Sequence, residues 1–298
     1  MITRKPDWLR VRMKTTPEFY RVDSILSKYR VHTICKEALC PNIYECWGSG
    51  TATFLILGDI CTRNCRFCSV KKGNPGGVID EDEPSRVALA ARELGLKYVV
   101  ITSVDRDDLP DGGACQYAKT IKAVREHIDN VVIEVLTPDF QESYNSIKTV
   151  VDAKPDVYAH NIETVERLTP VIRDRRAAYK RSLKVLRIVK DIDDSMITKS
   201  SILVGFGEKP YEVIKALEDL RNVGVDIVTI GQYLQPTTKH FPVAEYVEPK
   251  TFKYYEEIGY KLGFKLVISG PLVRSSYLAS KYYDEFIRKL KGDPSSVH

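Results

Sequence analysis

Short apolar runs alternate with amphipathic stretches through most of the chain. From residue 51 onward, runs rich in β-branched residues predict strands, and the stretches between them have the period of helices. The predicted strands are 53–57, 98–102, 131–136, 157–160, 201–206 and 226–231. The predicted helices lie at 84–95, 114–128, 140–152, 163–168, 179–190 and 210–223. Six β-α units joined by right-handed crossovers predict an α/β fold with a parallel sheet.

The two ends of the chain depart from this alternation. Residues 1–34 are polar, apart from a predicted helix at 17–30, and we expect them to wrap around the body as an extension. Pro41 and Gly48 predict an irregular segment after it. Beyond residue 235 we expect a helix at 249–262, a further strand at 265–269 and a last helix at 277–290. The predicted parts are therefore an N-terminal extension (1–50), a central body (51–235) and a C-terminal extension (236–298).

The composition is that of an ordinary soluble globular protein. Hydrophobic residues make up 43% of the chain and charged residues 29%, with a net charge of +5. No apolar run reaches the roughly 20 residues of a membrane span, so we expect no membrane partner. The N-terminus has no apolar core of a secretory signal. Seven cysteines then favour metal binding in a reducing compartment over disulfides, and we expect a cytoplasmic location.

The densest basic run lies at residues 173–190. It predicts either a solvated helix face or a docking surface for an acidic carrier domain. The run lacks the aromatic residues that stack on bases in proteins binding single-stranded nucleic acid, so we expect no nucleic-acid partner.

Six of the seven cysteines fall into two triplets on either side of the first predicted strand. The triplets, spaced C-x4-C-x5-C and C-x3-C-x2-C, are Cys35, Cys40, Cys46 and Cys61, Cys65, Cys68. A structural zinc site usually has four ligands, commonly in two close pairs, and neither triplet has that form. Three thiolates on a cubane of four irons and four sulfides leave one iron open to a substrate or cofactor. The seventh cysteine, Cys115, lies in a predicted helix, and we expect it to be a buried packing residue.

The second triplet, with Phe67 before its last cysteine, resembles the signature of the radical S-adenosylmethionine enzymes. The first triplet, the stretch GTATFLILGDICTRNCRFC and the motif RSSY at 274–277 narrow this resemblance to the lipoyl synthases. The resemblance runs from KPDWLR at 5–10 to RSSY. It implies an α/β fold in which the units form a partial (β/α)6 barrel of the TIM type, with both extensions covering the mouth. In such barrels the chemistry lies at the carboxyl ends of the strands.

The resemblance also implies an activity and its cofactors. Lipoyl synthases insert two sulfur atoms, at C6 and C8 of a protein-bound octanoyl chain, to give the lipoyl cofactor. They use S-adenosylmethionine and two 4Fe-4S clusters. One cluster reduces S-adenosylmethionine to release a 5′-deoxyadenosyl radical, and the auxiliary cluster donates sulfur. A radical is needed because unactivated aliphatic C–H bonds are too weakly acidic for a side-chain base.

The same resemblance assigns the ligands. Cys61, Cys65 and Cys68 are implied to hold the radical cluster, and the first triplet the auxiliary cluster. The fourth protein ligand of the auxiliary cluster is implied to be Ser276, with Ser275 as the alternative. Iron–sulfur sites favour soft thiolates, so physical chemistry alone does not predict a serine. Our hypothesis is that a weakly held hard ligand suits a cluster that must come apart.

Loops at the strand ends are candidates for binding S-adenosylmethionine. Asn161 and Glu163 follow the fourth strand and suit its amino acid part, although Asn161 could instead cap a helix. Arg173 is a candidate partner of the cofactor carboxylate, or a surface residue. The acid-rich loop at 103–113 follows the second strand and is a further candidate. The candidate adenine contacts after the fifth and sixth strands are Gly205, Gly207, Glu208 and Gln235, and Gln235 could instead line the pocket.

The implied protein partner is an octanoylated lipoyl carrier domain, either a dehydrogenase E2 subunit or the glycine cleavage H protein. An electron donor such as ferredoxin or flavodoxin is implied as well. The nearest alternative is another sulfur-inserting radical enzyme, resembling biotin synthase or a methylthiotransferase, but neither combines the first triplet with RSSY. The alternative of a different class is a zinc-stapled binding protein without catalysis.

Overall fold

The computed structural model describes residues 4–11, 13–277 and 279–283. Its main sheet has eight strands in the order β1-β2-β5-β6-β7-β8-β9-β10. All neighbours from β2 to β10 pair in parallel, and β1 pairs with β2 in antiparallel orientation. The strands are His32–Thr33 (β1), Thr53–Ile56 (β2), Tyr98–Ser103 (β5), Val132–Leu136 (β6), Val157–Ala159 (β7), Ile197–Val204 (β8), Ile227–Gln232 (β9) and Leu266–Gly270 (β10).

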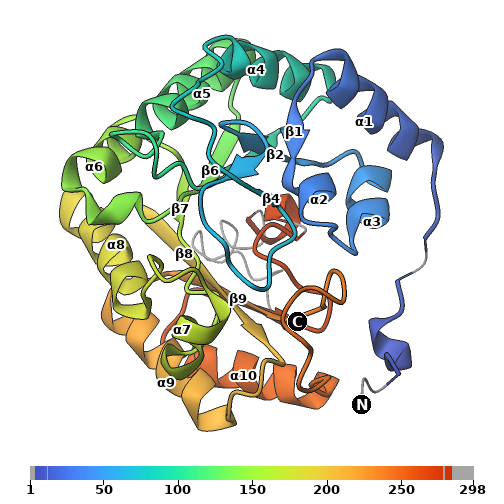
Figure 1. The fold of residues 1–298 in the computed structure, drawn as a ribbon, viewed down its shortest axis with the longest axis vertical. Coiled ribbons are helices and arrows are strands. Elements are labelled where there is room, and N and C mark those ends of the chain that lie inside the picture. Colours follow the sequence, from blue (N-terminus) through green and yellow to red (C-terminus); the bar gives the residue numbers. More distant parts are fainter. Residues whose placement is uncertain (1–3, 12, 278, 284–298) are drawn as a thin grey trace, which may run out of the picture.

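Helices lie on the outside of the curved sheet (Figure 1). The outer helices are α4 (Glu83–Glu93), α5 (Ala114–His127), α6 (Tyr144–Asp152), α8 (Tyr179–Ile192), α9 (Pro210–Asn222) and α10 (Pro249–Lys261). β1 and β10 stand at the two ends of the strand order, so the sheet is an open barrel. The predicted α/β partial barrel is confirmed, with β10 as a seventh parallel strand.

The strand cores are apolar because helices cover one face and the packed interior covers the other. β8 shows how the sequence can mislead. It begins at Ile197, four residues before the predicted start, because the polar residues at its beginning are buried with partners. Lys199 Nζ lies 2.8 Å from Glu134 Oε1 on β6, and the Thr198 amide donates to Asp226 at 3.0 Å. Paired in this way, polar side chains occupy positions where an apolar run would be expected.

Two further predictions differ from the structure. The first cysteine segment is not irregular, because it forms the short helices α2 (Ile34–Glu37) and α3 (Ile43–Gly48). Thr33 caps α2 by accepting a hydrogen bond from the Lys36 amide at 3.4 Å. Cys115 is exposed, not buried, at the start of α5. The predicted helix at 17–30 is α1 (Pro17–Lys28), capped by Thr16.

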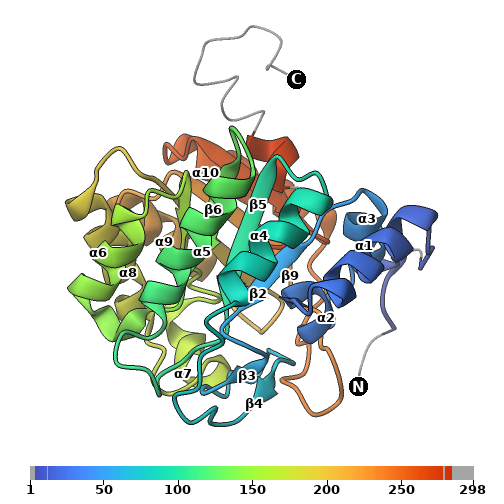
Figure 2. The same cartoon turned by 90° about the horizontal axis from the view of Figure 1, so that it is seen from above.

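The C-terminal segment enters the barrel after β10. A Cβ atom on Gly231 of β9 would lie 2.0 Å from the carbonyl oxygen of Val273, so the segment lies directly on the barrel wall. Farther along, Tyr283 packs against Tyr98 of β5, with 5.3 Å between ring centroids. Figure 2 shows this last described part, in red, at the end of the barrel opposite the small sheet of β3 (Ile60–Cys61) and β4 (Lys71–Lys72). Most of the predicted helix at 277–290 lies outside the described residues.

The predicted boundaries at residues 50 and 235 do not coincide with the edges of the sheet. β1 lies before the first boundary and β10 after the second, and both pair into the main sheet. Within the part of the chain that is described, no helix is long and apolar enough to cross a membrane.

Candidate active site

One cavity of about 440 Å³ opens where the parallel strands end. Residues from both extensions line it together with residues that follow the strands. All six triplet cysteines are among the lining residues, as are Ser275 and Ser276. None of the seven cysteines is in a disulfide. The structure therefore brings the two triplets and the RSSY motif, up to 241 positions apart in the chain (Cys35 to Ser276), to a single site.

The second triplet lies on a loop that is fastened to the barrel through its backbone. Cys61 ends β3, and Gly73 after β4 donates to its carbonyl oxygen at 3.0 Å. The Asn64 amide donates to Asp174 Oδ2 at 2.7 Å, and the Asp174 amide donates to Cys65 Sγ at 3.3 Å. Because its amides are held by partners on other loops, this loop presents its cysteines in a fixed arrangement.

Arg63 fixes the same loop from inside, and the sequence analysis missed it. Its side chain is 3% exposed, and its guanidinium donates two hydrogen bonds to Asp139, at 2.7 and 2.6 Å. Two more bonds go to Asp107, at 3.0 and 2.8 Å, and Asp105 Oδ1 lies 3.3 Å from Nε. Burial alone lowers the pKa of this guanidinium, but the carboxylates outweigh it and raise the pKa. The acid-rich loop at 103–113 could have indicated a buried arginine, since two of its carboxylates bind Arg63.

The first triplet lies on α2, α3 and the turn between them. The Cys40 amide donates to the Cys35 carbonyl at 3.0 Å, and the Thr51 amide donates to the Cys46 carbonyl at 2.9 Å. Next to Cys46, Trp47 is fully buried, so the indole anchors α3 in the core. The two triplet segments also touch directly, since Ser69 Oγ donates to the Glu37 carbonyl at 2.9 Å.

The triplet thiols are all harder to ionise than a free cysteine. Burial raises the pKa of Cys35 and of Cys61 to about 11, and that of Cys46 and of Cys65 to about 12. The pKa values of the other two, Cys40 and Cys68, are raised by burial as well. Cysteines of the same triplet also raise one another's pKa, as Cys40 does for Cys35 and Cys68 for Cys61. Buried thiols in this arrangement fit a cationic iron–sulfur core, which binds thiolates and displaces their protons.

Arg274 of the RSSY motif lies beside the first triplet. Burial lowers the pKa of its guanidinium, while the nearby Cys40 raises it. Among the described residues, no group of three or more His, Cys, Asp or Glu side chains is drawn together around a point for one metal ion.

Of the candidate cofactor residues after β7, Asn161 and Arg173 are buried and partly unsatisfied, and Glu163 is half-buried. Asn161 Nδ2 donates to Glu163 Oε1 at 3.1 Å, but Asn161 Oδ1 has no partner. Arg173 is 8% exposed and donates to Ser182 Oγ at 2.8 Å, while its Nε has no partner. All three candidates line the cavity. Asn161 caps no helix here, since the following short helix begins after Val165. Orphaned buried polar atoms facing a cavity fit a polar ligand such as the amino acid part of S-adenosylmethionine.

His160 supports this wall from behind. Its Nδ1 lies 2.9 Å from the Thr137 carbonyl and its Nε2 2.9 Å from Ser182 Oγ. Burial, reinforced by the positive charge of Arg173, lowers the pKa of the ring to about 4. His160 is therefore neutral at pH 7 and joins β7 to α8 through hydrogen bonds.

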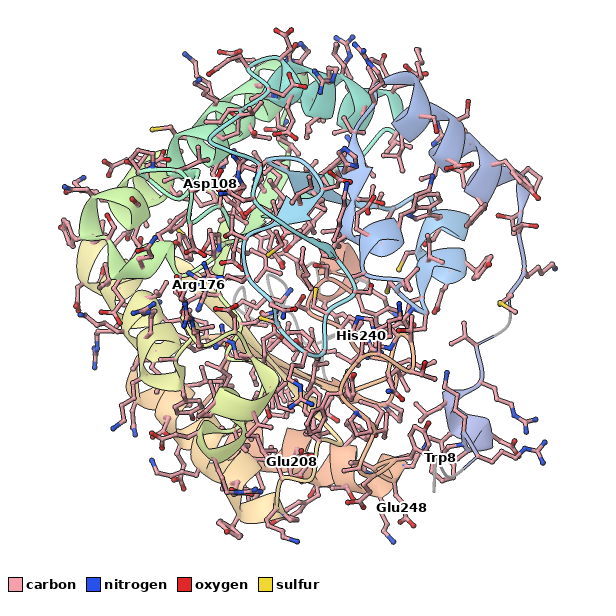
Figure 3. All side chains as sticks on the ribbon, in the orientation of Figure 1. Trp8, Asp108, Arg176, Glu208, His240 and Glu248 are labelled. Carbon is pink, nitrogen blue, oxygen red and sulfur yellow. The ribbon has the colours of Figure 1, made fainter. Side chains whose placement is uncertain are left out.

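The remaining candidate cofactor residues are divided by the structure. Gln235 lines the cavity, and its Nε2 donates to the His240 carbonyl at 2.8 Å. Gly205, Gly207 and Glu208 are not among the lining residues. The Glu208 carboxylate accepts from the Gly205 and Phe206 amides, at 2.6 and 2.9 Å, and so closes its own loop away from the centre (Figure 3).

That loop still shapes the cavity indirectly. The Phe206 ring stacks on Tyr233, with centroids 4.2 Å apart, and meets the edge of Phe67 at 6.4 Å. Tyr233 and Phe67 both line the cavity. Since Phe67 precedes Cys68, the loop after β8 supports the second triplet through aromatic packing.

Comparisons with known proteins agree with this geometry. Residues 55–220 match the model of the radical SAM superfamily. The solved structure of SuiB from Streptococcus suis bound to S-adenosylmethionine superposes with a TM-score of 0.57, at 11% identity, covering 82% of this chain and 59% of that one. Methylornithine synthase superposes at 0.53 and 13% identity, covering 72% and 70%. The fold and the cysteine loop thus define a radical S-adenosylmethionine enzyme.

Curated relatives narrow the class. The lipoyl synthase of Caldicellulosiruptor bescii is 56% identical over 289 residues, which is 96% of this chain and 99% of that one. The lipoyl synthase of Thermus thermophilus is 53% identical over 281 residues, covering 94% and 87%. The chain belongs to the lipoyl synthase family.

Membership of this family sets the activity. The chain is a radical S-adenosylmethionine sulfurtransferase that works with S-adenosylmethionine and two 4Fe-4S clusters. It inserts two sulfur atoms into a protein-bound octanoyl chain, at C6 and C8, and it needs a reductant.

Proposed function

We propose that the six triplet cysteines divide this work between them. Cys61, Cys65 and Cys68 hold the cluster that binds S-adenosylmethionine, on a loop whose backbone is fixed by the barrel. Cys35, Cys40 and Cys46 hold the auxiliary cluster, in the N-terminal extension. When bound, the two clusters and S-adenosylmethionine supply hydrogen abstraction from C6 and C8 and the sulfide that joins each carbon. The protein supplies the thiolates, the orientation of the groups and a cavity that limits water.

Ser276 is the fourth protein ligand of the auxiliary cluster in this proposal, and Ser275 is the alternative. Both serines line the cavity that the first triplet also lines. A serine oxygen is a harder ligand than a thiolate and suits iron–sulfur sites less well. An iron held in this way can leave when the cluster gives up its sulfur.

Asn161, Glu163 and Arg173 are proposed to hold the amino acid part of S-adenosylmethionine. Their support is the pair of unsatisfied buried atoms, Asn161 Oδ1 and Arg173 Nε. Gln235 belongs to the same wall and contributes to the nucleoside side. Gly205, Gly207 and Glu208 serve in this proposal by supporting the wall, since Glu208 bonds to its own loop.

The octanoyl group arrives on a lipoyl carrier domain, which we propose to be a dehydrogenase E2 subunit or the glycine cleavage H protein. Ferredoxin or flavodoxin is the proposed electron donor. The basic run at 173–190 lies on α8 and the residues before it. Its exposed members on α8, Lys180, Lys184 and Arg187, form a surface that suits an acidic carrier. Seven free thiols fit the reducing cytoplasm.

In this proposal the three predicted parts act as functional units, although one sheet crosses both boundaries. Residues 1–50 carry the auxiliary thiols, residues 51–235 the cofactor loops, and residues 236–298 the serines of RSSY. The carrier must reach the mouth where the three parts meet.

The single observation that carries this proposal is the gathering of six free thiols and the RSSY motif in one cavity. Anaerobic purification tests it, with an expected content of about eight irons per chain, two cubanes' worth. Mass spectrometry of an octanoylated carrier after turnover should then show two added sulfurs. A colourless protein with two zincs, or a carrier without added sulfur, contradicts the proposal.

A further inference from the structure

The two extensions are joined at the cavity by two long-range hydrogen bonds. Asn42 Nδ2 donates to the Leu272 carbonyl at 2.6 Å. The Tyr277 hydroxyl donates to the Glu45 carboxylate, with 3.1 Å to Oε1 and 3.0 Å to Oε2. The partners lie 230 and 232 positions apart in the chain. These contacts are therefore tertiary ties between the ends of the chain.

The positions of the ties relative to the candidate ligands are informative. Asn42 and Glu45 both lie between Cys40 and Cys46 of the first triplet. On the other side, the two bonds flank residues 273–276, which include Ser276. The ties thus enclose the stretch in which a serine of RSSY must face the auxiliary thiols.

The barrel holds the same stretch from the opposite side. The carbonyl of Val273 lies so close to Gly231 that a Cβ atom there would be 2.0 Å away. Within the stretch, the Tyr277 amide donates to the Arg274 carbonyl at 3.1 Å, which closes a turn around Ser275 and Ser276. The barrel lies on one side of the segment and the first triplet on the other. The two hydrogen bonds between the extensions therefore set how closely the serines approach the thiols.

The two ties differ in their exposure. Asn42 is 1% exposed, so water does not compete for its bond to Leu272. Glu45 is exposed, and the Tyr277 bond lies at the surface. An exposed hydrogen bond is opened more easily than a buried one, because water replaces it. The bond between Tyr277 and Glu45 is therefore the one of the two that opens more easily.

We propose that Tyr277 is a positioning residue, which through Glu45 holds Ser276 against the first cysteine triplet and so slows the loss of iron from it. The proposal rests on the proposed function in one respect, the assignment of Ser276 as ligand. Tyr277 itself touches neither substrate nor cofactor in this account, and it acts only through the segment that carries Ser276.

The chain offers a matched control. Tyr29 also donates its hydroxyl to a glutamate on a distant helix, Glu93, at 2.6 Å, and neither residue lines the cavity. Tyr277→Phe and Tyr29→Phe therefore remove the same kind of bond at two different places. In cluster-free full-length protein, hydrogen–deuterium exchange at residues 271–277 should be about five-fold faster in Tyr277→Phe, as expected for the loss of one hydrogen bond. Tyr29→Phe should leave it unchanged, and equal exchange in both variants overturns the positioning role.

The second measurement uses a background with Cys61→Ala, Cys65→Ala and Cys68→Ala, so that all bound iron belongs to the first triplet. Iron loss to a chelator should be about five-fold faster after Tyr277→Phe, again the effect of one hydrogen bond. Ser276→Ala should also speed it, and Tyr277→Phe should add nothing when Ser276 is already alanine. An equal effect of Tyr277→Phe with and without Ser276 contradicts the proposal, since the tyrosine would then act on the fold alone.

The Mössbauer spectrum of the same protein distinguishes failure of the serine assignment from failure of the positioning role. If Ser276→Ala and Ser275→Ala both leave the spectrum unchanged, the serine ligand of the proposed function is wrong and the positioning role falls with it. If Ser276→Ala changes the spectrum but Tyr277→Phe alters neither the spectrum nor iron loss, the ligand stands and the positioning role alone is overturned.

Discussion

The two cysteine triplets line the same cavity but are held by different means. The loop of Cys61, Cys65 and Cys68 is fastened to the barrel by backbone hydrogen bonds and by the buried Arg63 with its carboxylates. The segment of Cys35, Cys40 and Cys46 consists of two short helices outside the barrel, held by the packing of Trp47 and by contacts with the C-terminal segment.

This difference matches two different fates of a cluster. A cluster that is used repeatedly needs ligands on a rigid support, because the cofactor must be presented in the same geometry each time. A cluster that is consumed must let its iron go and be replaced. A segment of two short helices, with the hard oxygen ligand that we propose, suits that purpose better than a loop built into the barrel.

The largest expected effect separates the triplets by function. Cys61→Ala should abolish the cleavage of S-adenosylmethionine, because three thiolates are needed to hold the radical cluster. Cys35→Ala should preserve that cleavage and abolish sulfur insertion. Chromatography of released methionine and mass spectrometry of the carrier measure the two steps. Methionine release by Cys61→Ala, or sulfur insertion by Cys35→Ala, contradicts the division of roles.

The second expected effect is on stability. Arg63→Leu leaves the buried Asp139 carboxylate without its partner, which typically costs about 3–5 kcal/mol of unfolding free energy. Denaturant unfolding of the cluster-free protein measures this change. Arg181→Leu is the control, since Arg181 reaches Asp139 only at 3.9 Å and is more exposed. If Arg63→Leu lowers the free energy of unfolding no more than the control does, the loop that carries the second triplet does not depend on the buried charges.

The third effect concerns Ser276, the proposed fourth protein ligand of the auxiliary cluster. Ser276→Cys should hold the auxiliary cluster more firmly and slow sulfur insertion at least about ten-fold, the lower range for disturbing a metal site. Radical formation should continue, so methionine release without lipoyl product is the expected signature. If this variant completes both insertions at the normal rate, the hypothesis that a hard ligand helps the cluster come apart is wrong.

The smallest effect is a pH dependence on the barrel side. The pKa of His160 is lowered to about 4 from 6.5, so the unfolded chain binds more protons than the folded chain between these values. Stability contributed by neutral His160 is complete above about pH 6.5 and is lost as the pH falls toward about 4, a change of roughly 1–3 kcal/mol. Denaturant unfolding at pH 7 and pH 5 should show a smaller difference in His160→Gln than in the unaltered protein. An equal difference would mean that another group carries the acid sensitivity.

Much of the fold could be predicted from periodicity, because each parallel strand of the main sheet from β2 to β9 contains a buried apolar run bounded by turn residues. The error at β8 came from Lys199, whose charge is paired with Glu134 on a strand 65 positions away. A sequence does not show such a partner. The short helices around Cys40 were missed for a different reason, since Pro41 interrupts them and tertiary contacts stabilise what remains.

The candidate site was predictable where spacing carries chemistry, as it does for the six cysteines. Spacing did not indicate a role for Arg63, because its hydrogen-bond partners Asp107 and Asp139 lie 44 and 76 positions away in the chain. Glu208 was expected at the cofactor, and its place after a strand agreed with that, but its carboxylate binds two amides of its own turn. Local hydrogen bonding of this kind competes with ligand binding, and it depends on backbone angles that residue types alone do not set.

The central claim is that the cluster held by the first triplet supplies the sulfur and that the cluster held by the second triplet does not. The most direct test loads the protein with sulfide enriched in a heavy sulfur isotope, first in both clusters and then, after exchange at the labile site, in the radical cluster alone. Mass spectrometry of the lipoyl product after a single turnover reports the origin of each sulfur. The account predicts two heavy sulfurs from the fully labelled protein and two light sulfurs when only the radical cluster carries the label. Heavy sulfur in the product of the second sample would contradict it.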